Sequence, residues 1–584
     1  MKPSDIAPLI AGELGCRPVQ VEKTIELLDG GNTVPFIARY RKEVTGSLED
    51  EQIRTIEERL NTLRNLVKRQ EEILARIDEQ GKLTPELRQA IEKTRKLTEL
   101  DDLYLPYKQK RRTRAQQARE KGLEPLANAF LLQRETGGTA LEAAWAYVDP
   151  EKGVETPETA LEGARDIVAE MASENADLRK ALRQKLWNEG VLQTELVENA
   201  DEAQTFLMYR DYQEPVRSLP SHRVLAINRG EKKGCLKVHL LWEEKRARQL
   251  LQRRFVRRRS IYQEQLELAL ADGWKRLLFP ALEREIRHTL TENAEAQAIR
   301  VFGANLRQLL LQAPLAGRTV MGLDPGYRTG CKVAVVDPTG QVVDHGVIQV
   351  TQSEKQKEQA EEILLGMIKK HHVTLLSIGN GTASYETEQF AARLIQQHHL
   401  REVQYLITNE AGASVYSASR LAREELPEYD VTIRGAVSMA RRVQDPLAEL
   451  VKIDPQAIGV GQYQHDVDQK ALTGTLDGVV EMAVNHVGVD LNTASPALLS
   501  HVAGITATIA KNIVAYRNEN GRFTGRRQLL STPAGAGGLY PVRRVPADPG
   551  WEESSGCHSG ASGILPAGRN HSGETGLCGQ GFEG

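Results

Sequence analysis

Apolar residues recur at the spacing of an α-helix through the first 317 positions of the chain. The clearest run contains Ile53, Ile56, Leu60, Leu63 and Leu66. Side chains three and four positions apart share one face of a helix, and Glu and Arg occupy the other face here. The pattern therefore predicts amphipathic helices almost throughout residues 1–317, as an elongated helical N-terminal half.

One segment, residues 221–242, departs from that spacing. Its sequence is SHRVLAINRGEKKGCLKVHLLW, with β-branched and alternating apolar residues around Gly230 and Gly234. These features predict a short pair of strands. We therefore expect a helical region over residues 1–220, and a short β element with further helices, completing the N-terminal core, over residues 221–317.

A different pattern begins at Arg318. The run RTVMGLDPGYRTGCKVAVVDPTGQVVDHGVIQV contains three strand-like segments divided by Pro-Gly and Pro-Thr-Gly turns. Further along, we expect a helix over 354–370, a strand over 373–378, a helix from Tyr385 and a strand over 404–407. Strands that alternate with helices after a hairpin indicate one α/β domain, over residues 318–450, before a helical connector over 451–486.

Residues 487–531 have the pattern of a helix-hairpin-helix. We expect one helix over 496–502, capped by Asn492 or Thr493, and a second over 507–518. Between them, Gly504 allows a sharp turn and a close approach to a phosphate. An anion is favoured at the N-terminus of the second helix. There we expect the N–H groups of Ile505, Thr506 and Ala507 to point outward.

Five basic residues accompany this turn: Lys511, Arg517, Arg522, Arg526 and Arg527. Such residues contact the nucleic-acid backbone and do not read base sequence. A pair of packed helices with no ligand is the alternative. The combination of VDLNTAS, the Gly-Ile turn, IVAYR and NGRF resembles the competence-protein type of helix-hairpin-helix, which favours contact with a DNA or RNA backbone.

The composition limits the classes of function. The length of 584 residues suggests roughly four domains. The net charge of −3 means that any polyanion binding must come from local basic surfaces. Five scattered cysteines without a CxxC pair argue against a zinc site and indicate a reducing compartment. With no signal peptide and no apolar run of membrane-spanning length, we expect a cytoplasmic protein without membrane partners.

Two segments are strongly basic and contain no acid. The first holds Lys108, Lys110, Arg111, Arg112, Arg114 and Arg119. The second holds Lys245, Arg246, Arg248, Arg253, Arg254, Arg257, Arg258 and Arg259. A charge run is most often a solvated helix face. Because the chain is acidic overall, we give a groove for RNA or DNA about the same weight as a solvated face. Residues 108–114 are our second candidate contact with nucleic acid.

In the α/β domain, the motif GLDPG places Asp324 at the end of the first strand. On this motif the domain resembles the YqgF, or resolvase-like ribonuclease H, domain. The resemblance implies carboxylates that hold two divalent cations, Mg²⁺ or Mn²⁺, for hydrolysis. Glu410 and Asp445 are the candidate partners of Asp324, both as catalytic residues and as metal ligands.

These residues also have a purely structural interpretation. Asp324 precedes a proline and can hold a turn. The central strand ends in Gly379, Asn380 and Gly381, where many nucleases of this fold carry a glutamate. We therefore favour a scaffold that requires no cofactor over an active nuclease.

Three longer blocks carry a more specific resemblance. They are NTVPFIARYRKEVTG (32–46), LDDLYLPYKQKRRTRA (100–115) and PSHRVLAINRGE (220–231). With the α/β domain and the hairpin, they make residues 1–531 resemble the Tex family of transcription accessory proteins. The resemblance implies a bacterial cytoplasmic protein with a helix-turn-helix in its helical half. It also implies paired helix-hairpin-helix elements, a C-terminal S1 domain that binds RNA, and work alongside RNA polymerase.

Residues 532–584 contain thirteen glycines, five prolines and almost no apolar periodicity, which is typical of a disordered tail. A second hairpin element and an S1 domain are not recognisable there. Codons chosen for residues 539–550 spell FIQCAGFLRIPG in the +1 frame, which resembles the segment after the first hairpin in Tex proteins. We therefore interpret the tail as the product of a frameshift near Thr532 that leaves the chain truncated. A natural Gly-rich linker is the alternative.

The sequence thus predicts a multidomain, mainly α protein with one α/β domain. Its favoured function is a Tex-like scaffold that binds RNA or DNA and acts in transcription. One alternative is a metal-dependent nuclease of the Holliday-junction-resolvase or ribonuclease H type. Another is a protein-interaction platform built from the helical half.

Overall fold

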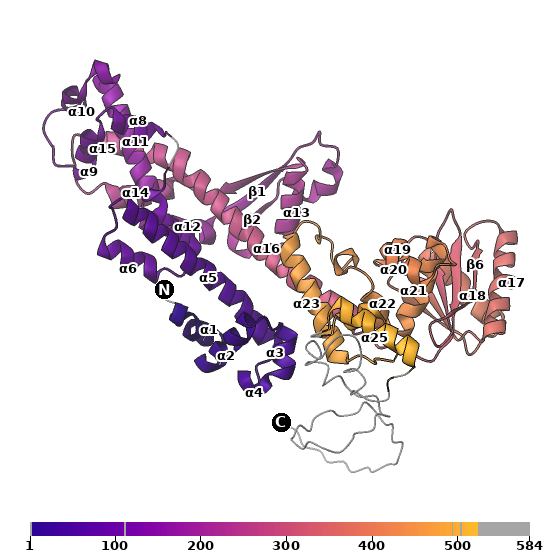
Figure 1. The fold of residues 1–584 in the computed structure, drawn as a ribbon. Coiled ribbons are helices and arrows are strands. Elements are labelled where there is room, and N and C mark those ends of the chain that lie inside the picture. The colour runs from indigo at the N-terminus through magenta and orange to yellow at the C-terminus, as the bar shows by residue number, and fades with distance from the viewer. Residues whose placement is uncertain (1–2, 110–111, 493, 503–504, 522, 524–584) are drawn as a thin grey trace, which may run out of the picture.

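The computed structural model describes residues 3–109, 112–492, 494–502, 505–521 and 523. Figure 1 shows an elongated helical half that a long helix joins to a sheet domain and to a last group of helices. Among these residues, no helix is both long enough and apolar enough to cross a membrane. The tail expected over 532–584 lies outside the described residues.

The first helices confirm the helical periodicity of the N-terminal half. The longest of them, α5 (Asp50–Glu79), buries the apolar residues of the predicted face. Its neighbours are α1 (Ile6–Leu14), α2 (Pro18–Asp29), α3 (Val34–Tyr40), α4 (Lys42–Thr45), α6 (Pro85–Lys93) and α7 (Leu97–Tyr104). Buried apolar side chains of these helices, except α4, form one core cluster that extends from Ile6 to Tyr104.

A second core surrounds the 32-residue helix α16 (Phe279–Leu310). At a rise of 1.5 Å per residue this helix is about 48 Å long, so it joins the helical half to the C-terminal elements. The helices before it are α8 (Arg114–Glu120), α9 (Glu124–Leu132), α10 (Ala140–Ala144), α11 (Pro157–Ser173), α12 (Ala176–Glu189), α13 (Ser221–Lys232), α14 (Glu244–Phe255) and α15 (Gln263–Asp272).

The strand pair predicted within residues 221–242 is wrong. The first half of the segment is helix α13, and only β3 (Leu236–Leu241) is a strand. β3 pairs antiparallel with β1 (Val191–Leu196), which also pairs with β2 (Gln213–Pro215). The partner of β3 thus lies some forty residues away, and packing of an apolar helix face overrode the local alternation.

The α/β domain expected after Arg318 is present. Its sheet has the order β6-β5-β4-β7-β8, antiparallel from β6 to β4 and parallel from β4 to β8. The strands are β4 (Val320–Asp324), β5 (Cys331–Val336), β6 (Val342–Ile348), β7 (Leu375–Gly379) and β8 (Gln404–Thr408). The carboxyl ends of the three parallel strands therefore meet at one edge of the sheet.

Helices cover both faces of this sheet (Figure 1). The side chains of α17 (Glu354–His371) and α18 (Ser384–Gln397) pack on one face, and those of α21 (Val431–Gln444) pack on the other. Gly322 in β4 permits the close approach of α21, because a Cβ at that position would lie 2.0 Å from the Ala436 carbonyl oxygen. Two short helices, α19 (Ala413–Ala418) and α20 (Arg420–Glu425), precede α21.

After the sheet domain the chain returns to helices. α22 (Pro446–Leu450) and α23 (Gln469–Val487) precede α24 (Pro496–Ser500) and α25 (Ala507–Asn520). Buried residues of all four belong to the core cluster of α16. The last two helices lie near the sheet domain, at the end of the molecule far from α8 and α10 (Figure 1).

Candidate nucleic-acid interface

Helices α24 and α25 form the predicted hairpin. Ser495 caps α24 by accepting a hydrogen bond from the Leu498 N–H at 3.2 Å, and Thr506 caps α25 in the same way. Of the two residues that we expected to cap α24, Asn492 does not do so, and Thr493 lies outside the described residues. The Asn492 side chain exchanges two hydrogen bonds with the Phe523 backbone, at 2.8 and 3.2 Å, and so joins the end of the hairpin to its beginning.

The N-terminus of α25 is accessible to a ligand. Thr506, Ala507 and Thr508 are exposed, whereas Ile505 just before them is buried in the core. Lys511 lies one helical turn further along and is also exposed. Because the first N–H groups of a helix have no partner within the helix, this end favours an anion.

Two of the predicted contacts have structural roles. The Ile505 N–H donates to the Val502 carbonyl oxygen at 2.9 Å, so it is already paired. Arg517 Nη1 donates to the carbonyl oxygens of Leu491 and Ala494, at 3.0 and 2.9 Å. The Arg517 guanidinium therefore holds the loop before α24 and is not directed at a phosphate.

Six predicted contacts lie outside the described residues. They are Gly504, Arg522, Arg526 and Arg527 of the hairpin and Lys110 and Arg111 of the first basic segment. The roles assigned to them stay predictions.

The first basic segment is partly neutralised by acids from neighbouring helices. Arg112 forms an ion pair with Glu120 at 2.9 Å, and Arg119 forms one with Glu170 at 2.8 Å. In the described part of residues 108–114, the exposed cations without an ion pair are Lys108 and Arg114.

The second basic segment keeps more unpaired charge. Arg246 and Arg254 form ion pairs with acids of α12, and Arg248 pairs within α14. Five other cations of the segment are exposed and make no ion pair with any described residue: Lys245, Arg253, Arg257, Arg258 and Arg259. We call these five residues the α14 surface.

Two of the predicted carboxylates come together at the carboxyl ends of the parallel strands. Asp324 is the last residue of β4, and Glu410 follows β8 by two positions. The Glu410 side chain folds across the end of β7, since a Cβ at Gly381 would lie 1.9 Å from Glu410 Oε1. The pKa of Asp324 is raised, mainly by burial and to a lesser extent by the negative charge of Glu410. The positive charge of Lys332 acts in the opposite direction and lowers this pKa.

The third candidate, Asp445, is not part of this pair. It caps α22 by accepting a hydrogen bond from the Ala448 N–H at 2.9 Å. Asp324 lies against Gly435, near the start of α21, whereas Asp445 follows the last residue of that helix. Ten residues of helix separate the two positions, which is about 15 Å. Asp445 therefore lies beyond the opposite end of α21 from Asp324.

The carboxylate pair does not fit a two-cation centre. Within the described ranges, no three Asp, Glu, His or Cys side chains are placed to share a metal ion. The Asn380 side-chain oxygen, at the end of β7, accepts the Glu410 N–H at 3.1 Å. A clamp of two cations needs more carboxylates than Asp324 and Glu410 supply.

The architecture is that of a helical multidomain protein with a ribonuclease H-like domain followed by a helix-hairpin-helix. Family models match the chain in the same order: a Tex-like protein N-terminal domain over residues 4–78, a Tex central region-like segment over 137–302, a Tex protein YqgF-like domain over 318–444 and a helix-hairpin-helix motif over 484–534. The chain belongs to the Tex family.

Similar proteins cover most of the chain. Protein tex of Bordetella pertussis is 49% identical over 539 residues, which are 90% of this chain and 68% of the relative. The transcriptional accessory protein Tex of Neisseria gonorrhoeae is 47% identical over 538 residues, 91% of this chain and 70% of the relative. The human S1 RNA-binding domain-containing protein 1 is 38% identical over 545 residues, 90% of this chain and 54% of the relative.

Two residues of these sites were not found from the sequence. Lys332 lies on β5 directly opposite Asp324, so it is recognised as a neighbour of the carboxylate pair only once the strand register is known. Thr508 adds an exposed position to the N-terminus of α25. The preference of helix starts for anions was the one sequence feature that pointed to it.

Proposed function

We propose that this protein is a Tex-type scaffold that binds RNA or DNA in the cytoplasm and acts in transcription. The observation that carries the proposal is the exposed N-terminus of α25, where Thr506 and Ala507 offer backbone N–H groups and Lys511 offers a charge. Both kinds of contact go to phosphate and are independent of base sequence. Binding is therefore expected to be weakly specific and sensitive to salt.

A charge placed at the helix cap tests this interface. Aspartate caps a helix as well as serine or threonine, so Thr506→Asp keeps the fold but sets a negative charge where a phosphate would bind. Thr506→Ser is the matched control, because it keeps the cap and adds no charge. We expect Thr506→Asp to weaken binding of labelled single-stranded RNA and duplex DNA roughly tenfold in fluorescence anisotropy, by like-charge repulsion. Equal affinities for the two variants would contradict the proposal.

The role in transcription rests on the relatives. One is named a transcriptional accessory protein and another an S1 RNA-binding domain-containing protein. RNA polymerase is the protein partner we infer. Its co-purification with the intact chain after nuclease digestion would support a direct contact, and its loss on digestion would identify nucleic acid as the bridge.

The carboxylate pair gives a nuclease as the second candidate function. Branched and single-stranded DNA and RNA should be incubated with the protein and Mg²⁺ or Mn²⁺. Cleavage lost in Asp324→Asn and Glu410→Gln, but kept in Asp445→Asn, would assign hydrolysis to the pair. Binding without cleavage would favour the scaffold. Asp445→Asn is a suitable control, since asparagine preserves the cap of α22.

A further inference from the structure

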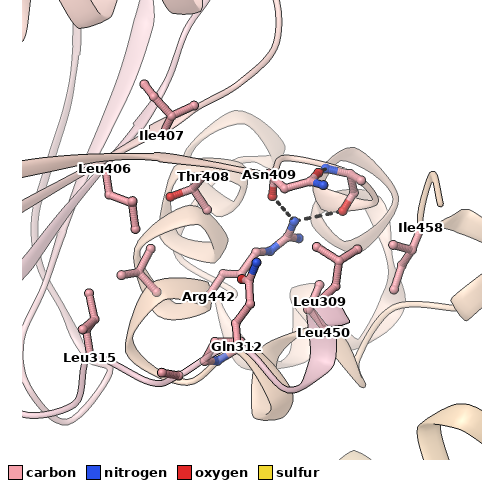
Figure 2. A pocket seen from close by; sticks show the side chains of 14 residues that line it. Leu309, Gln312, Leu315, Leu406, Ile407, Thr408, Asn409, Arg442, Leu450 and Ile458 are labelled. Atoms are coloured by element: carbon pink, nitrogen blue, oxygen red, sulfur yellow. Dashed lines mark hydrogen bonds between the residues drawn. The ribbon is translucent and has the colours of Figure 1, made fainter. Parts of the chain in front are cut away.

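A buried arginine in the sheet domain has no part in the proposed function. Arg442 lies in α21, and 4% of its surface is exposed. Its Nη1 donates to the carbonyl oxygens of Asn409 and Ala411, the latter at 2.9 Å (Figure 2). Its Nε and Nη2 are buried and make no hydrogen bond with any described residue.

The charge of Arg442 is not matched by an ion pair in the described part of the chain. The charges of Glu449 and, more weakly, Glu410 favour the charged form of Arg442, but neither acid forms an ion pair with it. Glu449 accepts from Ser438 at 2.8 Å and pairs with Lys452 at 2.9 Å. Burial lowers the pKa of Arg442 to about 10, so the guanidinium is still charged at neutral pH. A buried charge with unpaired donors is unfavourable, which makes a bound anion a reasonable partner.

The two unpaired donors form one edge of the guanidinium. Elsewhere in this chain, Arg59 presents the same edge to Glu13, with Nε–Oε2 and Nη2–Oε1 distances of 2.7 and 2.8 Å. A carboxylate matches this fork with two parallel, charge-assisted hydrogen bonds. Arg442 therefore provides the protein half of such a pair.

A cavity of about 250 Å³ adjoins Arg442, between β8, the start of α22 and the end of α16 (Figure 2). Arg442 is the one charged residue that lines it, and Leu309, Leu406 and Ile458 give it apolar walls. Its volume lies just below the range of pockets for drug-sized ligands, so it suits a smaller molecule. Gln312 also lines the cavity and is exposed, so its side chain can move aside as a ligand enters.

We propose that this cavity binds a small carboxylic acid, with the carboxylate on the Nε and Nη2 edge of Arg442 and an apolar body between Leu309 and Ile458. One negative charge on the ligand offsets the one positive charge of the site. Phosphate is the poorer ligand, because it brings up to two charges and further oxygens to a lining with no second cation.

Benzoate is the probe for the first experiment, with the intact chain in isothermal titration calorimetry. We expect benzoate to bind and to raise the melting temperature, and benzamide and inorganic phosphate to bind at least tenfold more weakly. Arg442→Lys keeps a positive charge but loses the fork, so it should weaken benzoate at least tenfold. No binding of benzoate, or equal binding of benzamide, overturns the proposal.

A second pair of variants leaves Arg442 in place and so decides the question if Arg442→Lys does not fold. Gln312→Glu supplies a carboxylate from within the chain, and it should raise the melting temperature and reduce benzoate affinity at least tenfold. Gln308→Glu adds the same charge at an exposed position of α16 that does not line the cavity, and it should do neither. Identical behaviour of the two variants overturns the proposal.

Discussion

Asp324 is harder to ionise than an ordinary aspartate, because it is buried at the end of β4 and because Glu410 adds a second negative charge beside it. The raised pKa means that the folded protein holds the Asp324 proton to a higher pH than the unfolded chain does. Ionisation of Asp324 therefore opposes folding. This opposition lowers the free energy of unfolding, and the loss of stability grows as the pH rises through the raised pKa.

Asp324→Asn removes this opposition. We expect the variant to be more stable than the parent at pH 7.5. The gain in melting temperature should shrink as the pH falls toward 4, because protonation of Asp324 removes the cost of its buried charge. Asp344→Asn is the control of opposite sign. Burial of Asp344 is outweighed by its hydrogen bonds from His371 and Lys370, which hold its pKa below the usual range. Asp344→Asn should therefore lose stability at pH 7.5. If the melting temperature of Asp324→Asn rises by the same amount at every pH, the argument for Asp324 is contradicted.

Among the elements, the hairpin depends on its connections to the surrounding chain. α24 has five residues, too few for a helix to be stable by itself. Its loop is held by Arg517, and Asn492 joins the segment before α24 to Phe523 beyond α25. The basic side chain of Arg517 thus holds the loop before α24 in place.

Arg517→Met should loosen the hairpin. Loss of two hydrogen bonds from a charged donor is expected to reduce its stability by roughly 1.5–3 kcal/mol, seen as faster amide hydrogen exchange in residues 505–520. Lys511→Met, on the exposed side of α25, should leave exchange unchanged and reduce the slope of log affinity against log salt by about 1. If Arg517→Met leaves hydrogen exchange unchanged, its structural role is refuted.

In the whole molecule, the hairpin and the α14 surface lie toward opposite ends (Figure 1). The length of α16, about 48 Å, gives the scale of their separation. At 3.4 Å per base pair, that span corresponds to about 14 base pairs of duplex. The two surfaces therefore do not form a single groove, and a short duplex reaches one of them at a time.

Charge reversal of Arg257, Arg258 and Arg259 tests this arrangement. We expect the triple variant to weaken binding of a 40-base-pair duplex and to flatten its salt dependence, while affinity for a 10-base-pair duplex that occupies the hairpin is kept. Reversal of Lys355, Lys369 and Arg393, exposed cations on α17 and α18, is the matched control and should change neither. A loss that is equal for both duplex lengths would contradict separate surfaces.

The sequence by itself determined the features that depend on neighbouring residues. Helical spacing predicted α5, alternating segments and turns predicted the α/β domain, and the Gly-Ile turn predicted α24 and α25. Caps, turns and amphipathic faces are decided within a few residues, so local patterns find them.

Only the tertiary structure decided the contacts between distant segments. It paired β3 with β1, engaged Arg517 with carbonyl oxygens, and paired Arg112 with an acid. It also brought Glu410 to Asp324 but left Asp445 at the far end of α21. The physical reason is that a side chain's partners are set by the packing of whole elements, and residue spacing along the chain does not contain that packing.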